Sequence, residues 1–206
     1  MITIIDTGIA NVGSFKYKLF NVGIESHIAT TGEDITNATK LILPGVGHFK
    51  SGMNSLNVNN IRESLKRKVL NEKTPIIGIC LGMQLLTNGS EEGNIAGLGW
   101  INSDTKRFDF SHQNDNKLKI PHVGWSKIDR KEDSVLLKDI PYDHKFYFTH
   151  SYYVVCNNEK NVYATTKYGL EFSCLVQKDN IYGTQFHPEK SHSTGFQVLI
   201  NFIKYA

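Results

Sequence analysis

Short runs of mostly apolar residues, each of strand length, recur along the N-terminal half of the chain. They occupy residues 2–5, 40–43 and 75–80, and the last run leads directly into a helix-like segment at 81–86. A run that is apolar at nearly every position is typical of a strand buried on both faces of a sheet. These segments therefore predict the inner strands of an α/β sheet.

The segments between these runs have apolar residues at helical spacing. The first would bury one face of a helix through Phe15, Leu19 and Val22. A second helix is predicted from residues that recur every four positions, Ile61, Leu65 and Val69. Its other face is basic, and we expect that face to be exposed to solvent: Arg62, Lys66, Arg67 and Lys68. Alternating strands and helices predict parallel pairing, and so a three-layer sandwich around a mostly parallel central sheet.

The pattern changes after about residue 97, where strand-like segments follow one another. They are expected at 117–120, 145–156, 162–167, 172–177 and 181–186. Turn-forming pairs predict antiparallel connections at 157–158, 168–169 and 179–180. A last helix has one apolar face, made by Phe196, Leu199, Ile200 and Ile203. No linker or repeat divides the chain, so residues 1–206 are predicted to form a single flavodoxin-like α/β domain with an antiparallel extension.

Composition narrows the class of protein. The chain has 206 residues, with 23 Lys and Arg against 20 Asp and Glu, and this near balance argues against a nucleic-acid-binding protein. No apolar run approaches the roughly 20 residues of a membrane span. The three cysteines, Cys80, Cys156 and Cys174, have no metal-type spacing and are odd in number. We expect a soluble cytoplasmic protein with no membrane association, metal or cofactor.

One cysteine lies at a predicted junction between a strand and a helix, in Gly78-Ile79-Cys80-Leu81-Gly82. Nucleophiles of α/β hydrolytic folds occupy such turns, where a Cβ two positions to either side would collide with the neighbouring strand or helix. The following helix offers its N-terminal amides to a thiolate. We therefore predict that Cys80 is a nucleophile rather than a packing residue, whereas Cys156 and Cys174, within strand-like runs, are expected to pack.

A base for this thiol is predicted near the C-terminus. His187 ends an apolar strand, and Pro188 cannot continue the hydrogen-bond ladder. On extended backbone, Glu189 would project to the same side as His187 and hold its ring. Cys80, His187 and Glu189 therefore form a predicted triad for acyl transfer through a thioester.

Backbone amides are suited to stabilise the oxyanion of such a reaction. One predicted donor is the N–H of Leu81. A second would come from Val46 or Gly47, in a glycine-containing loop after a strand, whose peptide can turn toward the site or away from it. The alternative is a plain turn without a catalytic role.

Five motifs stand out when the chain is taken as a whole: Pro44-Gly45-Val46-Gly47-His48-Phe49, Gly78-Ile79-Cys80-Leu81-Gly82-Met83-Gln84, Pro121-His122-Val123-Gly124-Trp125, Tyr147-Phe148-Thr149-His150-Ser151-Tyr152 and Gln185-Phe186-His187-Pro188-Glu189-Lys190-Ser191. Together they resemble class I, triad-type, glutamine amidotransferases, and within that family the glutaminase subunits of imidazole glycerol phosphate synthases. The resemblance spans nearly the whole chain.

The resemblance implies hydrolysis of glutamine to glutamate and ammonia. Cys80 would be the nucleophile, His187 first base and then acid, and Glu189 the group that orients it. The glutamine would be held by side chains and backbone at Gln84, Glu92, His150, Ser151 and Tyr152. The alternatives are a solvated helix residue for Gln84 and an ordinary loop glutamate for Glu92.

The resemblance also implies a heterodimer with a (β/α)₈ cyclase subunit that receives the ammonia in histidine biosynthesis. The docking surface would include Asn11, His122, Trp125 and Lys190, although Trp125 would also suit a core. The glutaminase is expected to be slow without its partner.

The chain departs from the family at two places on the expected docking face. Ser126 follows Trp125 where the family usually has Asn, and the N-terminal motif Asp-Tyr-Gly-x-Gly-Asn is altered at residues 6–11. These departures leave open a second acceptor, a nucleotide-activated sugar in surface-polysaccharide synthesis. A third alternative is a non-catalytic protein that uses Cys80 as a redox sensor.

Overall fold

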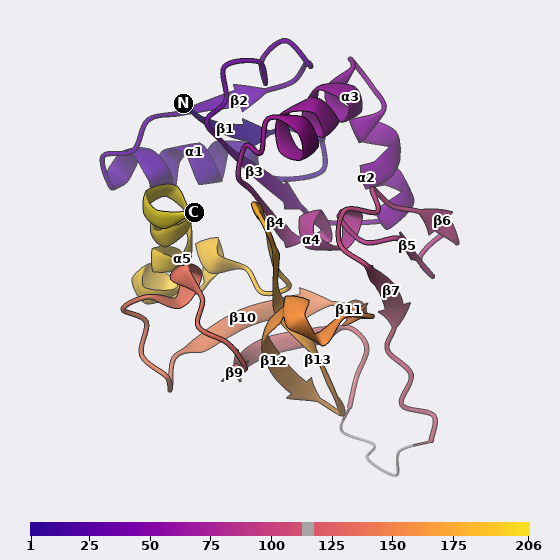
Figure 1. Cartoon of the computed structure of the whole chain (residues 1–206). Helices are drawn as coiled ribbons and strands as arrows, with labels where there is room; N and C mark the ends of the chain where they lie inside the picture. Colours follow the sequence, from indigo (N-terminus) through magenta and orange to yellow (C-terminus); the bar gives the residue numbers. More distant parts are fainter. Residues whose placement is uncertain (113–117) are drawn as a thin grey trace.

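Parallel strands form the centre of the computed structural model, which describes residues 1–112 and 118–206 (Figure 1). Their order across the sheet is β2, β1, β3, β4 and β14. The bounds of these strands are β1 Ile2–Ile5, β2 Ser26–Ala29, β3 Lys40–Gly45, β4 Ile76–Cys80 and β14 Ile181–Thr184. The predicted parallel sheet is confirmed, with the edge strand β2 as an addition.

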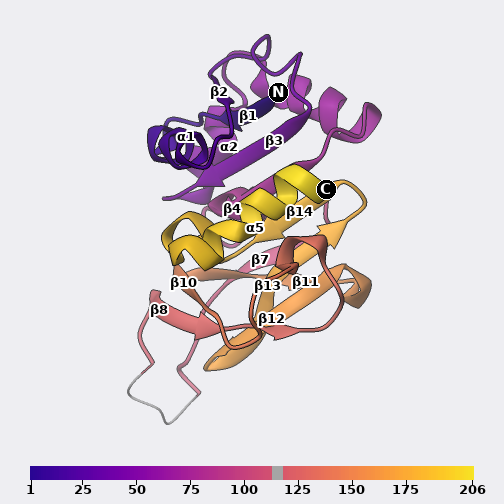
Figure 2. The same cartoon turned by 90° about the vertical axis from the view of Figure 1, so that its left-hand side faces the viewer.

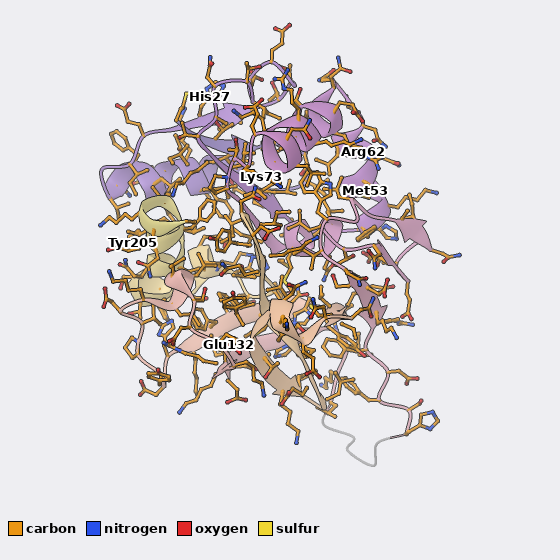
Figure 3. All side chains as sticks on the ribbon, in the orientation of Figure 1. His27, Met53, Arg62, Lys73, Glu132 and Tyr205 are labelled. Atoms are coloured by element: carbon orange, nitrogen blue, oxygen red, sulfur yellow. The ribbon has the colours of Figure 1, made fainter. Side chains whose placement is uncertain are left out.

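Helices cover both faces of this sheet and complete the predicted three layers (Figure 2). Successive strand residues point to opposite faces, so Ile4 of β1 packs with one set of helices and Ile5 with the other. The helices beside Ile4 are α1 Val12–Asn21 and α5 His192–Tyr205. Those beside Ile5 are α2 Phe49–Leu56, α3 Ile61–Lys66 and α4 Leu81–Leu85. Side chains fill the space between helices and sheet (Figure 3).

The helical spacing predicts most buried and exposed positions correctly, with two exceptions. Phe15 and Leu19 of α1 are buried, but Val22 follows the end of the helix and is 46% exposed. The basic face expected on the second helix is also incomplete. Lys68, in a π-helical turn after α3, is only 7% exposed, and its Nζ lies 2.6 Å from a carboxylate oxygen of Glu72.

Antiparallel strands extend the sheet beyond β14, as predicted. They are β13 Leu170–Lys178, β11 Tyr152–Cys156 and β7 Ser103–Arg107, with β12 Val162–Tyr168 and β9 Asp129–Arg130 to the side. Beyond β7 the short β5 Gly89–Ser90 pairs in parallel with β7, and β6 Ile95–Ala96 is its antiparallel neighbour. The turns at 168–169 and 179–180 join antiparallel neighbours. The turn at 157–158 does not, because β11 and β12 each pair with β13.

The prediction of one strand over 145–156 is wrong. The chain leaves a small separate sheet at Ser151, so that β10 Lys145–His150 pairs with β8 His122–Lys127, while β11 joins the main sheet. The strand predicted at 117–120 is also misplaced. Residue 117 lies outside the described residues, 118–120 are not strand, and β8 starts after Pro121, which has no N–H to donate.

Candidate active site

Strand β4 runs into helix α4 without an intervening loop, and Cys80 is the residue at the junction. Its backbone has φ 54° and ψ −109°, a region that residues with a side chain rarely adopt. Such a sharp turn is typical of nucleophiles held above the edge of an α/β sheet.

The glycines beside Cys80 are required by close backbone packing. A Cβ on Gly78 would lie 2.6 Å from the carbonyl group of Gly82. A Cβ on Gly82 would lie 1.8 Å from the carbonyl oxygen of Leu43 in β3. The predicted reason for small residues two positions to either side of Cys80 is therefore confirmed.

His187 and Glu189 form a buried pair just beyond β14. The Nδ1 of His187 lies 2.8 Å from Oε1 of Glu189, and the two residues are 1% and 7% exposed. A carboxylate only accepts, so Nδ1 carries the proton of this bond. The expected extended backbone is wrong, because residues 188–190 form a 3₁₀ turn. The turn nonetheless brings the carboxylate to the ring.

The charge of His187 is set by opposing effects. Burial lowers the pKa of His187, but the negative charge and hydrogen bonding of Cys80, followed by those of Glu189, outweigh it and raise the pKa from 6.5 to about 10. Apart from Cys80, the buried Nε2 of His187 has no hydrogen-bond partner among the described residues. Cys80 and Glu189 therefore favour the protonated form of the His187 ring.

A cavity of about 450 Å³ opens over Cys80. It brings together the residues predicted for the oxyanion hole and for glutamine binding: Val46, Gly47, Leu81, Gln84, Glu92, His150, Ser151 and Tyr152. Lys190 and Thr149 also line it. His187 and Glu189 line a second cavity of about 240 Å³, which also includes Asn11 and Lys190.

Gln84 is buried, so the alternative of a solvated helix residue is wrong. Its Nε2 donates to the carbonyl oxygen of Tyr152 at 3.0 Å and to Oε1 of Gln185 at 3.1 Å. Both amide hydrogens are thus engaged within the protein, and Oε1 of Gln84 is the atom left to accept from a ligand.

Glu92 has a structural contact that its sequence position did not indicate. One carboxylate oxygen accepts from the backbone N–H of Phe49 at 2.6 Å, at the start of α2. The positive end of a helix favours such a charge. Glu92 is half-buried and still lines the cavity, so the contact holds the carboxylate in place beside Cys80.

Two histidine rings lie in a directional chain of hydrogen bonds. Nδ1 of His150 lies 2.7 Å from the carbonyl oxygen of Tyr152, and its Nε2 lies 3.1 Å from Nδ1 of His122. The Oγ of Ser126 lies 3.3 Å from Nε2 of His122. Because a carbonyl oxygen only accepts, His150 donates to Tyr152 and each following group donates inward. Burial lowers the pKa of His150 to about 3 and of His122 to about 4, so both rings are neutral.

The expected docking residues do not all reach the surface. His122 is 2% exposed, and its ring bonds inside the protein, so its predicted place on a docking surface is wrong. Asn11 and Lys190 are exposed, and Asn11 also caps α1 by accepting from the backbone N–H of Ser14. Trp125 is 41% exposed and stacks on His192 with ring centroids 4.6 Å apart, so a core role for it is wrong.

Gln185 is a residue of this site that the sequence analysis missed. Its side chain is fully buried, and its Nε2 lies 3.6 Å from Sγ of Cys80. The signal that could have found it is its place in the motif of residues 185–191, two positions before His187.

Across residues 1–112 and 118–206, no three His, Cys, Asp or Glu side chains are grouped to hold a metal ion. Over the same residues, no helix combines the length and apolar character needed to cross a bilayer.

Comparisons with known proteins address the family and the fold. The profile of the family described as "Glutamine amidotransferase class-I" matches residues 3–205. The "Imidazole glycerol phosphate synthase subunit HisH 2" of Methanococcus maripaludis is 51% identical over 206 residues, 100% of each chain. The subunit HisH of Leptospira borgpetersenii is 43% identical over 202 residues, 98% of each chain. In fold, the chain is similar to PurLQS from Thermotoga maritima, with a TM-score of 0.73 at 15% identity, covering 99% of this chain and 97% of that chain.

The packing at Gly82 generates a first prediction. Helix propensity alone would favour Gly82→Ala, but the clash with the carbonyl of Leu43 should lower the free energy of unfolding by more than about 3 kcal/mol. Urea denaturation measures this, and Gly13→Ala, at an exposed position of α1 where a Cβ meets nothing closer than 3.7 Å, is the control. The control should gain up to about 1 kcal/mol. Equal stability of the two variants would contradict the packing argument.

The neutral histidine pair generates a second prediction. Unfolding returns both rings to a pKa of 6.5, so the unfolded chain binds more protons as the pH falls below 6.5. Each ring should therefore cost roughly 2 kcal/mol of stability by about pH 5. Between pH 6.5 and about pH 5, the free energy of unfolding should fall less steeply in His150→Asn than in the wild type. His112→Asn, in an exposed turn, should leave this slope unchanged. An unchanged slope in His150→Asn would show that the ring is not held neutral.

Proposed function

The chain belongs to the class-I glutamine amidotransferase family, and from this premise we propose that it hydrolyses glutamine to glutamate and ammonia at Cys80. The observation that carries the proposal is the 2.8 Å bond between His187 and Glu189, with His187 charged by its interaction with Cys80. The family profile over residues 3–205 supports taking residues 1–206 as one functional domain.

In the first half of the reaction, the thiolate of Cys80 attacks the carbon of the glutamine side-chain amide. The imidazolium of His187 gives its Nε2 proton to the amide nitrogen, the C–N bond breaks, and ammonia leaves a thioester on Cys80. The raised pKa of His187 supports this order, in which its proton is already in place before the substrate is attacked.

In the second half, water replaces ammonia. The neutral imidazole of His187 takes a proton from water as its oxygen attacks the thioester carbon, and the C–S bond breaks. Glutamate leaves, and the thiolate and imidazolium are restored. Throughout, Glu189 accepts from Nδ1 and keeps Nε2 as the nitrogen that exchanges the proton.

The remaining residues of the cavity have proposed roles in binding. The amides of Leu81 and of Val46 or Gly47 would hold the oxyanion, and Gly47 at φ 93° can turn its peptide more freely than other residues can. The carboxylate of Glu92 and Oε1 of Gln84 suit the α-ammonium group. The backbone N–H groups of residues 150–152 suit the α-carboxylate.

The curated relatives are named as subunits of a synthase, which implies a partner subunit. We propose that this partner is a (β/α)₈ cyclase subunit in a heterodimer, which makes imidazole glycerol phosphate and aminoimidazole carboxamide ribonucleotide with the ammonia, in histidine biosynthesis. Asn11, Trp125 and Lys190 remain proposed docking residues. The names of the relatives do not favour a sugar acceptor, and a redox sensor would not need the pair of His187 and Glu189. The cytoplasmic location remains a prediction.

Removal of the nucleophile is the test of the proposed function. In the complex with the barrel subunit and its nucleotide ligand, Cys80→Ala should reduce glutamate release by at least about 1,000-fold. Cys156→Ala is the matched control, because that thiol lies in β11 away from the cavity over Cys80. An enzyme-coupled glutamate assay measures both. Glutamate release that survives Cys80→Ala would refute the proposed chemistry.

The peptide at residues 46–47 is expected to turn its N–H toward the site or away from it, and this expectation generates a further prediction. If the partner is needed to aim this N–H, the isolated chain should turn over glutamine about 100-fold more slowly than the complex, which is the usual cost of one oxyanion donor. Steady-state kinetics with and without the partner measure the ratio. Equal rates would mean that the oxyanion hole is complete in the isolated chain.

A further inference from the structure

The side chain of Gln185 touches the nucleophile but has no part in the triad. We propose that Gln185 is a further catalytic residue, whose side-chain N–H donates a hydrogen bond to Sγ of Cys80 and stabilises its thiolate. This inference rests on the proposed function, because it concerns the same sulfur atom.

The contact is buried and well placed. Nε2 of Gln185 lies 3.6 Å from Sγ of Cys80, and the Gln185 side chain is 0% exposed. Its backbone N–H donates to the carbonyl oxygen of Cys174 at 2.9 Å, which anchors the residue to β13. A thiolate accepts hydrogen bonds more strongly than a thiol does, and a bond to a buried charge is worth more than one in water. The N–H donor of Gln185 therefore favours the thiolate form of Cys80.

The orientation of this amide is set by its neighbours. The carbonyl oxygen of Tyr152 can only accept, so Gln84 must direct its NH₂ group toward it. The same NH₂ group has a second hydrogen, which Oε1 of Gln185 accepts. Nε2 of Gln185 must then point to Cys80. A flipped Gln185 would place oxygen against the thiolate and NH₂ against NH₂, which is unfavourable at both ends.

Gln84 is accordingly a positioning residue for Gln185. The oxygen of Tyr152 that orients Gln84 also accepts from Nδ1 of His150 at 2.7 Å, so its place is fixed from two sides. Tyr152 and Gln84 both line the cavity over Cys80. The wall of the proposed glutamine site and the donor to the nucleophile are therefore parts of one hydrogen-bond network.

The test measures the thiolate directly, as the rate of Cys80 alkylation by iodoacetamide in the full chain, followed by mass spectrometry of the Cys80 peptide. Gln185→Leu should lower this rate about ten-fold at neutral pH, the usual effect of losing a donor to a charged group. At alkaline pH, where the thiol ionises without help, the variant and wild-type rates should converge. A purely structural role would not produce this dependence on pH.

Kinetics of the complex provide the second readout. Gln185→Leu should lower kcat about ten-fold and change KM for glutamine by less than about two-fold, because the bond is to the nucleophile. Gln84→Leu should lower the alkylation rate by a smaller factor. Gln197→Leu, whose amide bonds to Asn201 within α5, is the matched control and should change neither quantity.

Gln185→Met keeps the length of the side chain and provides the same test where Gln185→Leu does not fold. Alkylation of Cys80 at the wild-type rate in the folded variant at neutral pH would overturn the proposal. A wild-type complex that releases no glutamate would refute the proposed function instead. The alkylation comparison would still decide the role of Gln185, since it needs no substrate.

Discussion

The geometry of this site depends on the direct passage of β4 into α4 at Cys80. The chain can make that turn only because Gly78 and Gly82 let backbone approach backbone, and it holds Cys80 at φ 54° and ψ −109°. Strands β3 and β14 flank β4, with Gly45 level with Cys80 and Thr184 level with Ile79. The segments that follow these two strands therefore arrive on either side of the sulfur, one with residues 46–47 and the other with His187.

The protonation state of each histidine in this site depends on its burial and on the groups that contact its ring. His187 keeps a proton because Cys80 and Glu189 supply negative charge that outweighs the cost of burial. Within residues 1–112 and 118–206, no carboxylate pairs with His150 or His122 in this way, and burial keeps both rings neutral. Two types of histidine thus lie close together, His187 as the proposed proton donor to the substrate and His150 and His122 as parts of the scaffold. Their hydrogen-bond partners, rather than their depth, separate the two roles.

The sequence predicted those elements whose signal is local. Strands β1, β3 and β4 are apolar at most positions, and the proposed triad lies in motifs with glycines two positions from Cys80 and a proline between His187 and Glu189. By contrast, β2 is a mixed edge strand, and β8 contains glycine, serine and lysine, so neither has a strand-like pattern. The break at Ser151 depends on which sheet each half joins. The resemblance of motifs predicted His122 on the docking surface, because a motif does not show whether a side chain is buried. A lone amide such as Gln185 has no local sequence pattern that marks it.

An electrophilic glutamine analogue, such as its chloromethyl ketone, tests the central claim most directly, because it requires both a glutamine site and a nucleophilic sulfur beside it. With the chain in complex with its barrel partner, mass spectrometry should find one adduct, on Cys80, which excess glutamine prevents. Cys156 and Cys174 should stay unmodified. An adduct spread over the three cysteines, or one on Cys80 that glutamine does not prevent, would contradict a glutamine-hydrolysing centre at the junction of β4 and α4.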